Sequence, residues 1–417
     1  MLDIKRIIND RDNVERNLLK RMDEVNFDNL IKNYTEKNEL LSKVEVLKSE
    51  KNKIAKEVGQ FKRNKKDATA LIEKMTISNK QIDALDTKIK QLEKIINAEM
   101  AGIPNIPDDD VLPGDKENNK IVKTFKEKPV FNFKFKDHVE LATSLNLIDY
   151  ERGAKMSGTG FWLYTGIGAR LEWAILNYFI DFHTENGYTF ILPPHMLNYE
   201  SGYAAGQFPK FEDDVFHTEE NFLIPTSETA LINIHRNEII DEKKLPIKYF
   251  AYSPCYRKEA GSSRKEERGM IRGHQFNKVE MFAYCKQEES TDIHNEMVEN
   301  AEKLVEGLGL HYTTTKLAAK DASSSMAKTY DIEVWIPSMS YKEVSSVSNA
   351  RCYQARRGKI RYKEEGNIKF AHTLNGSGLA TSRLIPAILE QYQNEDGSVT
   401  IPEVLRKYMG GIKKITK

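Results

Sequence analysis

Residues 27–100 contain no proline and a single glycine, Gly59. Apolar residues recur there every three or four positions, in two runs: Leu41, Val44, Leu47, Ile54, Val58 and Phe61, then Leu71, Met75, Ile82, Leu85, Ile89, Leu92 and Ile96. This spacing is typical of one apolar stripe along an α-helix. The segment KRNKKD (62–67) interrupts it, so we predict two long helices folded into an antiparallel hairpin, a coiled coil over about 27–100.

The predicted hairpin has a narrow apolar seam, so it must project from a larger domain or bind a partner. Between Lys43 and Lys66 it carries nine Lys and Arg against three Glu, a local charge of 9 − 3 = +6. Two interpretations stay open: a solvated, charged coiled coil, or a surface that grips nucleic-acid phosphates without reading bases.

The chain has 417 residues, too many for one ordinary core, so we expect at least two domains. Its 63 Lys and Arg balance 62 Asp and Glu, so total charge points to no partner. Three widely spaced cysteines, Cys255, Cys285 and Cys352, predict a reducing compartment and no structural zinc. The most hydrophobic segment, LEWAILNYFIDF (171–182), is too short and charged to cross a bilayer. We expect a cytoplasmic protein.

Pro, Gly and acidic residues crowd the segment AGIPNIPDDDVLPGDKENNK (101–120), which cannot continue a helix. We predict a helical N-terminal domain over 1–100, a linker over 101–128 and a second domain over 129–417. The second domain mixes amphipathic helices at 169–187 and 294–309 with alternating strands that lack a βαβ rhythm. This pattern favours the α+β class, an antiparallel sheet covered by helices.

A run of Arg, Lys and Glu lies between two predicted strands, 249–259 and 276–282. By strand parity, Phe276, Lys278, Glu280 and Phe282 share one face, and Asn277, Val279 and Met281 share the other. Arg257 and Glu259 share a face of the preceding strand. An exposed face with weak cross-strand ion pairs is one interpretation. A polar face kept near a core for a charged ligand is the other.

The segment HTLNGSGLATSRLIPAILEQYQ (372–393) predicts a strand, a tight Asn-Gly-Ser-Gly turn and a helix. It places Asn375 and Ser377 at the turn and Arg383 near the helix start. The segment is either an ordinary turn or an anion pocket in which a guanidinium reaches a phosphate.

Several segments resemble those of bacterial-type seryl-tRNA synthetases, which are class II aminoacyl-tRNA synthetases. The resemblance covers essentially the whole chain, in order, and rests on IPTSETA (224–230), CYRKEAG (255–261), RGMIRGHQFNKVEMF (268–282), KTYDIEVWIPS (328–338), EVSSVSN (343–349), QARRGKIRY (354–362), HTLNGSGLA (372–380), AGIPNIP (101–107) and GSVTIPEVLRKYMGG (397–411). It implies a class II antiparallel sheet preceded by a helical tRNA-binding hairpin.

The resemblance also implies ATP-dependent activation of L-serine to seryl-adenylate, followed by transfer to tRNA. The catalytic residues would be Arg257, Glu259 and Arg383. The serine site would comprise Thr226, Ser227, Glu228, Arg257, Glu280, Asn375 and Ser377. The ATP site would comprise Arg257, Lys258, Glu259, Phe276, Glu343, Val344, Ser345, Ser346 and Arg383. Glu343 and Ser346 would hold Mg²⁺ through ATP, since a hard cation prefers oxygen ligands.

Its implied macromolecular partners are tRNA(Ser), also tRNA(Sec), and a second copy of the chain, with no role for DNA or a membrane. Family members are homodimers, and NGYTFILPPHM (186–196) resembles the dimer-interface motif. A phosphate-binding role for the hairpin agrees with this resemblance, because RNA is often recognised through shape and backbone.

Two segments depart from the family pattern. In TTTKLAAKDASSSMAKTYD (313–331) the usual Cys-Thr-Gly run before Asp321 is replaced, and SNARCYQARR (348–357) lacks the expected acidic and aromatic residues. Alternatives to serine–tRNA ligation are therefore a divergent synthetase paralogue with another acceptor or a resistance role, or a non-catalytic RNA-binding protein. The last predicts loss of Arg257, Glu280 or Arg383, and all three are present.

Overall fold

A computed structural model of the chain describes residues 1–258 and 269–417. The chain divides into two compact units. The helical unit comprises Leu2–Glu15 and Asp23–Pro104, and the sheet unit comprises Met1, Arg16–Met22 and Asn105–Lys417. We describe each by itself.

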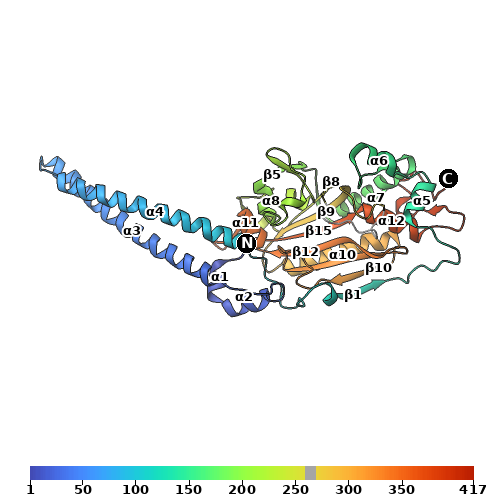
Figure 1. Ribbon diagram of the computed structural model, residues 1–417, viewed down its shortest axis with the longest axis horizontal. Helices are drawn as coiled ribbons and strands as arrows, with labels where there is room; N and C mark the ends of the chain where they lie inside the picture. Colours follow the sequence, from blue (N-terminus) through green and yellow to red (C-terminus); the bar gives the residue numbers. More distant parts are fainter. Residues whose placement is uncertain (259–268) are drawn as a thin grey trace. The chain divides into compact units, whose positions relative to one another are not determined.

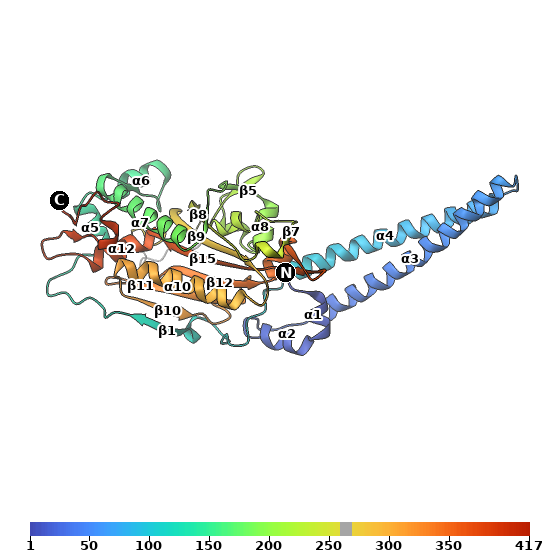
Figure 2. The same cartoon turned by 180° about the vertical axis from the view of Figure 1, so that it is seen from behind.

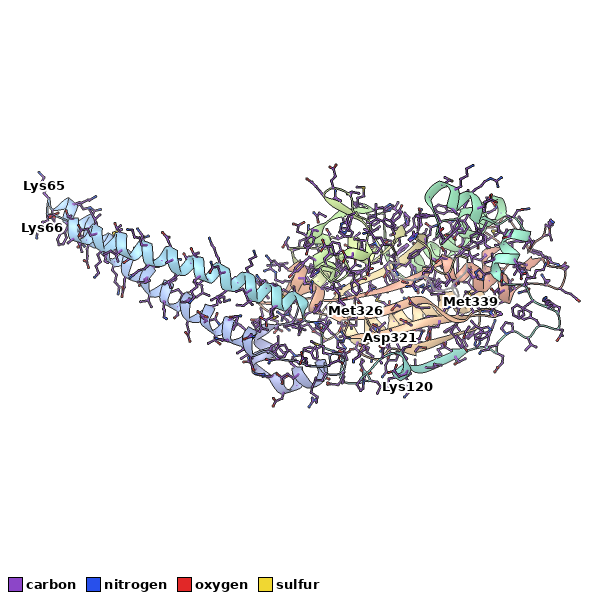
Figure 3. All side chains as sticks on the ribbon, in the orientation of Figure 1. Lys65, Lys66, Lys120, Asp321, Met326 and Met339 are labelled. Carbon is purple, nitrogen blue, oxygen red and sulfur yellow. The ribbon has the colours of Figure 1, made fainter. Side chains whose placement is uncertain are left out.

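Two long helices, α3 (Asp28–Arg63) and α4 (Thr69–Gly102), dominate the helical unit and pack against each other. They confirm the predicted hairpin, and Figure 3 shows Lys65 and Lys66 at its turn. The seam contains Leu40, Val44, Ile82, Ile89 and Leu92. The prediction that Leu41 lies in the seam was wrong. It is 36% exposed because Leu40, one helical turn before Val44, takes its place on the buried stripe. Phe61, also predicted on the stripe, is exposed.

A large sheet organises the other unit (Figure 1). Within the described part of the chain it has eight strands in the order β1-β10-β11-β12-β15-β9-β8-β4. Every neighbouring pair is antiparallel except β4 and β8. In that order the strands are Lys120–Phe125, Tyr312–Lys316, Lys328–Ile336, Ser340–Arg351, His372–Ala380, Gln275–Cys285, Ile247–Tyr256 and Thr189–Ile191. Strand β1 belongs to this sheet although it lies inside the predicted linker, 101–128, whose bounds stay a prediction.

Three helices pack against this sheet: α7 (Gly166–Glu185), α10 (Ser290–Leu308) and α12 (Thr381–Gln391), which Figure 2 shows from behind. The core between helices and sheet includes Val279 and Met281, both fully buried. Glu280, between them in β9, points to the opposite face by strand alternation. The predicted division of β9 into an apolar and a polar face is thereby confirmed, as is the α+β class.

Shorter elements complete the two units. The remaining helices are α1 (Ile4–Asn9), α2 (Arg11–Leu18), α5 (His138–Ser144), α6 (Tyr150–Ser157), α8 (Tyr199–Ala205), α9 (Glu228–Leu231) and α11 (Tyr353–Gly358). Small sheets pair β2 (Ile148–Asp149) with β3 (Leu163–Tyr164), β5 (Met196–Asn198) with β6 (Asn221–Leu223), β13 (Arg361–Glu364) with both β14 (Asn367–Phe370) and β7 (Ile239–Asp241), and β16 (Val399–Thr400) with β17 (Lys414–Ile415). None of the helices in residues 1–258 and 269–417 is long and apolar enough to cross a membrane.

Candidate active site

A cavity of about 500 Å³ opens on the polar face of the sheet. Its walls come from β9, β12 and β15 and from the segments 205–228 and 323–326. Residues predicted from distant parts of the sequence meet there: Thr226, Glu228, Arg257, Glu280, Glu343, Ser346, Asn375 and Ser377.

Glu280 is the most buried charged group of this cavity, with no exposed surface. Lys278 Nζ lies 2.5 Å from its Oε2 atom. Asn375 Nδ2 donates to Oε1 at 3.2 Å, and Ser377 Oγ donates to Oε2 at 3.3 Å. The Oδ1 atom of Asn375 is buried and has no hydrogen-bond partner among the described residues. A buried acceptor of this kind is costly unless a ligand supplies a donor.

The predicted turn at Asn375–Gly378 is wrong, because β15 runs without a break from His372 to Ala380. Its glycines serve close packing. A Cβ atom on Gly378 would lie 2.3 Å from His183 Nε2, and one on Gly376 would lie 3.2 Å from side-chain carbons of Met281 and Val347. Asn375 and Ser377 therefore reach the cavity as alternate residues of a strand, paired with β9 in a register that places Ser377 opposite Glu280.

Thr226 and Glu228 line the cavity beside Glu280, at the start of α9. Lys278 Nζ donates to Thr226 Oγ1 at 2.8 Å, and Gln354 Nε2 donates to Glu228 Oε1 at 2.6 Å. Burial, with the nearby Glu280 carboxylate as a second cause, raises the pKa of Glu228 to about 7. A carboxylate with such a pKa gains from a cationic ligand, which stabilises its ionised form.

Arg257 follows directly after β8, which ends at Tyr256 and not at residue 259 as predicted. Its Nε donates to the Pro225 carbonyl at 3.3 Å, and its guanidinium lies 5.2 Å from the centre of the Phe276 ring. A recess of about 40 Å³ adjoins the cavity at this point, and its lining includes the predicted ATP residues Arg257, Phe276, Glu343, Val344 and Arg383. The recess thus combines an aromatic ring with three guanidinium groups, those of Arg257, Arg272 and Arg383.

Arg383 lies in the first turn of α12, as predicted. Its Nη1 donates to the Glu343 carbonyl at 2.7 Å and lies 3.5 Å from the Glu343 carboxylate. Glu343 and Ser346 both come from β12 and offer oxygen atoms at the cavity wall. Among the residues that the structure describes, no group of three or more His, Cys, Asp or Glu side chains is arranged to hold a metal ion alone.

Four predicted site residues lie elsewhere or are not described. Ser227 is fully buried and bonds to Ser253 Oγ at 2.6 Å, and Ser345 is fully buried and donates to the Ser377 carbonyl at 2.5 Å. Neither of them lines the cavity or the recess. Lys258 donates its backbone N–H to Asp214 O, and Glu259 lies outside the described residues.

Strand parity placed Lys278 on the face of Glu280 but gave it no role in the site; it bridges Glu280 and Thr226. The prediction missed Gln354, which reaches Glu228 from α11, a contact that is recognisable only in three dimensions. Arg272 lines both the cavity and the recess. The divergent segment also contributes, since Ser323, Ser325 and Met326 line the cavity. Figure 3 labels Met326 and Asp321 in this part of the sheet unit.

Two protein-family models match separate parts of the chain and agree with this architecture. Residues 210–392, which contain most of the cavity wall, match the class II tRNA synthetase core domain shared by the enzymes for Gly, His, Pro, Ser and Thr. Residues 1–107 match the seryl-tRNA synthetase N-terminal domain. The fold and site thus define a class II aminoacyl-tRNA synthetase.

Full-length relatives narrow this class. Serine–tRNA ligase 2 of Clostridium acetobutylicum is 57% identical over 98% of this chain and 99% of its own length. Serine–tRNA ligase of Exiguobacterium sibiricum is 45% identical over the full length of both chains. The crystal structure of seryl-tRNA synthetase from Pyrococcus horikoshii complexed with ATP has a TM-score of 0.92 at 36% identity and covers 100% of this chain and 99% of that one. The chain belongs to the seryl-tRNA synthetase family, which confirms the resemblance found in its sequence.

Proposed function

We propose that the chain is a serine–tRNA ligase. Serine and ATP would form seryl-adenylate and pyrophosphate, and the seryl group would then pass to the 3′ end of tRNA(Ser), releasing AMP. The observation that carries the proposal is the buried carboxylate of Glu280, surrounded at hydrogen-bond distance by Asn375, Ser377 and Lys278. None of the relatives described above has a name that points to another acceptor or to resistance.

The hydroxyl, ammonium and carboxylate groups of serine would each contact a different set of residues in the cavity. Glu280 and Ser377 would bind its hydroxyl, and Thr226 and Glu228 its ammonium. Arg257 would bind its carboxylate, because a guanidinium offers paired donors to two oxygens. A pocket built around a hydroxyl rejects alanine by leaving buried polar groups unpaired, which gives selectivity on the order of 10⁴.

ATP would occupy the recess that adjoins the serine site. Adenine would stack on Phe276, Arg257 would neutralise the α-phosphate and Arg383 the outer phosphates. The carboxylate of serine attacks the α-phosphate, so positioning and charge neutralisation matter more than proton transfer. Mg²⁺ fits the oxygens of Glu343 and Ser346. The phosphates would supply further ligands, and the ion would offset phosphate charge.

The helical hairpin would bind the tRNA through its basic distal half. Exposed lysines near the turn, including Lys65 and Lys66, suit phosphate contacts without base reading. The proposal includes the homodimer predicted from residues 186–196. Its support is the edge strand β4 and the helix α7 that contacts it. Phe190 and Leu192 are 39% and 71% exposed there, and Trp173 of α7 is 51% exposed. A cytoplasmic location also belongs to the proposal.

Amino-acid-dependent pyrophosphate exchange tests the first step. Exchange should occur with serine and be far weaker with alanine, threonine and cysteine. Charging of tRNA(Ser) tests the second step, and deletion of residues 40–85 should abolish charging while sparing exchange. Absence of exchange with serine would overturn the proposal. Exchange without charging by the intact chain would favour a synthetase paralogue, and charging after the deletion would refute the role of the hairpin.

A further inference from the structure

Gln354, in the first turn of α11, has a side chain that is fully buried and fully hydrogen-bonded. Its Nε2 atom donates to the Ala205 carbonyl at 2.9 Å and to Glu228 Oε1 at 2.6 Å. Its Oε1 atom accepts from Thr373 Oγ1 at 2.7 Å. One amide group thus joins the end of α8, the start of α9 and strand β15.

A neutral amide is suited to this position for two reasons. Glu228 is buried and lies near a second carboxylate, Glu280, so another anion beside it would be unfavourable. An apolar residue in place of Gln354 would leave Thr373, the Ala205 carbonyl and one oxygen of Glu228 without these bonds, which is costly in a buried network. Only a group that donates twice and accepts once satisfies all three partners.

We propose that Gln354 is a positioning residue for the amino-acid site: it holds Oε1 of Glu228 and so leaves Oε2 to receive the ammonium group of the substrate. The inference rests on the proposed function, because it takes Glu228 as the ammonium acceptor. Gln354 itself does not line the cavity, so it acts through Glu228.

The electrostatic surroundings of Glu228 give this role a measurable signature. Burial and the Glu280 carboxylate disfavour its ionised form, whereas Gln354, Lys278 and Arg257 favour it, and together these effects raise the pKa of Glu228 to about 7. Ammonium binding requires the carboxylate, so kcat/KM for serine should rise with pH through neutrality. Loss of the Gln354 donor should raise the pKa of Glu228 and move this rise to higher pH.

The test compares serine-dependent pyrophosphate exchange in the full-length chain, Gln354→Leu, Gln354→Glu and a matched control. The control is Gln393→Leu, since Gln393 is also a buried glutamine with three hydrogen bonds, to Lys136 and Glu390, away from the cavity. Gln354→Leu should raise KM for serine roughly 10- to 100-fold, as expected for a lost bond to a charged group. KM for ATP should not change.

Gln354→Glu keeps the shape of the side chain and guards against a folding defect in the leucine variant. It adds a carboxylate beside Glu228, so its KM for serine should rise at least as much and its pH midpoint should shift in the same direction. Gln393→Leu should alter neither. The inference is overturned if both Gln354 variants retain the original KM for serine and pH midpoint, or if KM for ATP rises equally. Loss of serine exchange in the unmodified chain would instead refute the proposed function.

Discussion

The helical hairpin and the sheet unit organise their polar residues in opposite ways. In α3 and α4 a thin line of buried residues holds the helices together, and the charged side chains stand in solvent. In the sheet unit the charged side chains around the proposed serine site are themselves buried, and two of them, Lys278 and Glu280, form an ion pair. We infer that the hairpin acts through its summed charge, whereas the cavity depends on the placement of single atoms.

Replacing Arg257 should cause the largest loss of activity, because the proposed chemistry takes place wholly in the sheet unit and Arg257 contacts both substrates there. Arg257→Ala should lower serine-dependent pyrophosphate exchange by about 10³-fold, since removing one preorganised donor costs 10²–10³ and Arg257 serves two substrates. Arg257→Lys should not restore it, because a lysine cannot donate in a paired fashion. Recovery of the rate with lysine would show that charge alone suffices, as it does in our account of the hairpin.

Glu280 should show the next largest effect and a substrate-dependent one. Glu280→Gln should lower kcat/KM for serine about 10²-fold in the exchange assay, because a charge-assisted bond to the serine hydroxyl is weakened. Alanine makes no such bond, so its much slower exchange should change less. Equal losses for both amino acids would mean that Glu280 supports the fold and does not read the hydroxyl.

Neutralising the hairpin turn should have a smaller effect and spare the chemistry. We expect the quadruple variant Lys62→Ala, Arg63→Ala, Lys65→Ala and Lys66→Ala to raise KM for tRNA about 10-fold and to flatten its salt dependence, because each lost phosphate contact lowers the salt slope by about one. Pyrophosphate exchange should be unchanged. The matched control replaces Lys32, Lys37, Lys90 and Lys94, far along the helices from the turn. If both variants weaken charging equally, the charge near the turn has no special role.

The smallest effect concerns stability. Burial raises the pKa of Glu172, on α7, to about 7, although Asn277 and Thr381 both donate to its Oε1 atom. A carboxyl group whose pKa is higher when folded stabilises the fold most at low pH, and this contribution is lost as pH rises through 7. Between pH 6 and pH 8 the free energy of unfolding should therefore fall by about 1 kcal/mol, which denaturant unfolding would measure. Glu172→Gln should flatten this slope, while a variant in the exposed hairpin turn should leave it unchanged.

Local patterns allowed much of this architecture to be predicted. The helical hairpin follows from a 3.6-residue period, and the two faces of β9 follow from simple alternation. Errors arose where the deciding contact is distant in the sequence. The glycines of β15 suggested a turn because nothing local reveals that His183 and Met281 pack against them. Gln354 was not recognised because its partners lie 126 and 149 residues away, at Glu228 and Ala205. The domain boundaries predicted from the sequence, at residues 100 and 128, stay a prediction.

Strand β15 lies between β12 and β9 in the sheet, and this order matters during synthesis. The helical hairpin is complete once Gly102 has left the ribosome, and its contacts are local, so it can form early. The cavity cannot close until residues 372–391 arrive to join strands made long before. A nascent or truncated chain that stops before His372 would therefore display the proposed RNA-binding hairpin without a serine site. Such a chain would bind tRNA without charging it, so residues 372–391 are what turn an RNA-binding chain into a ligase.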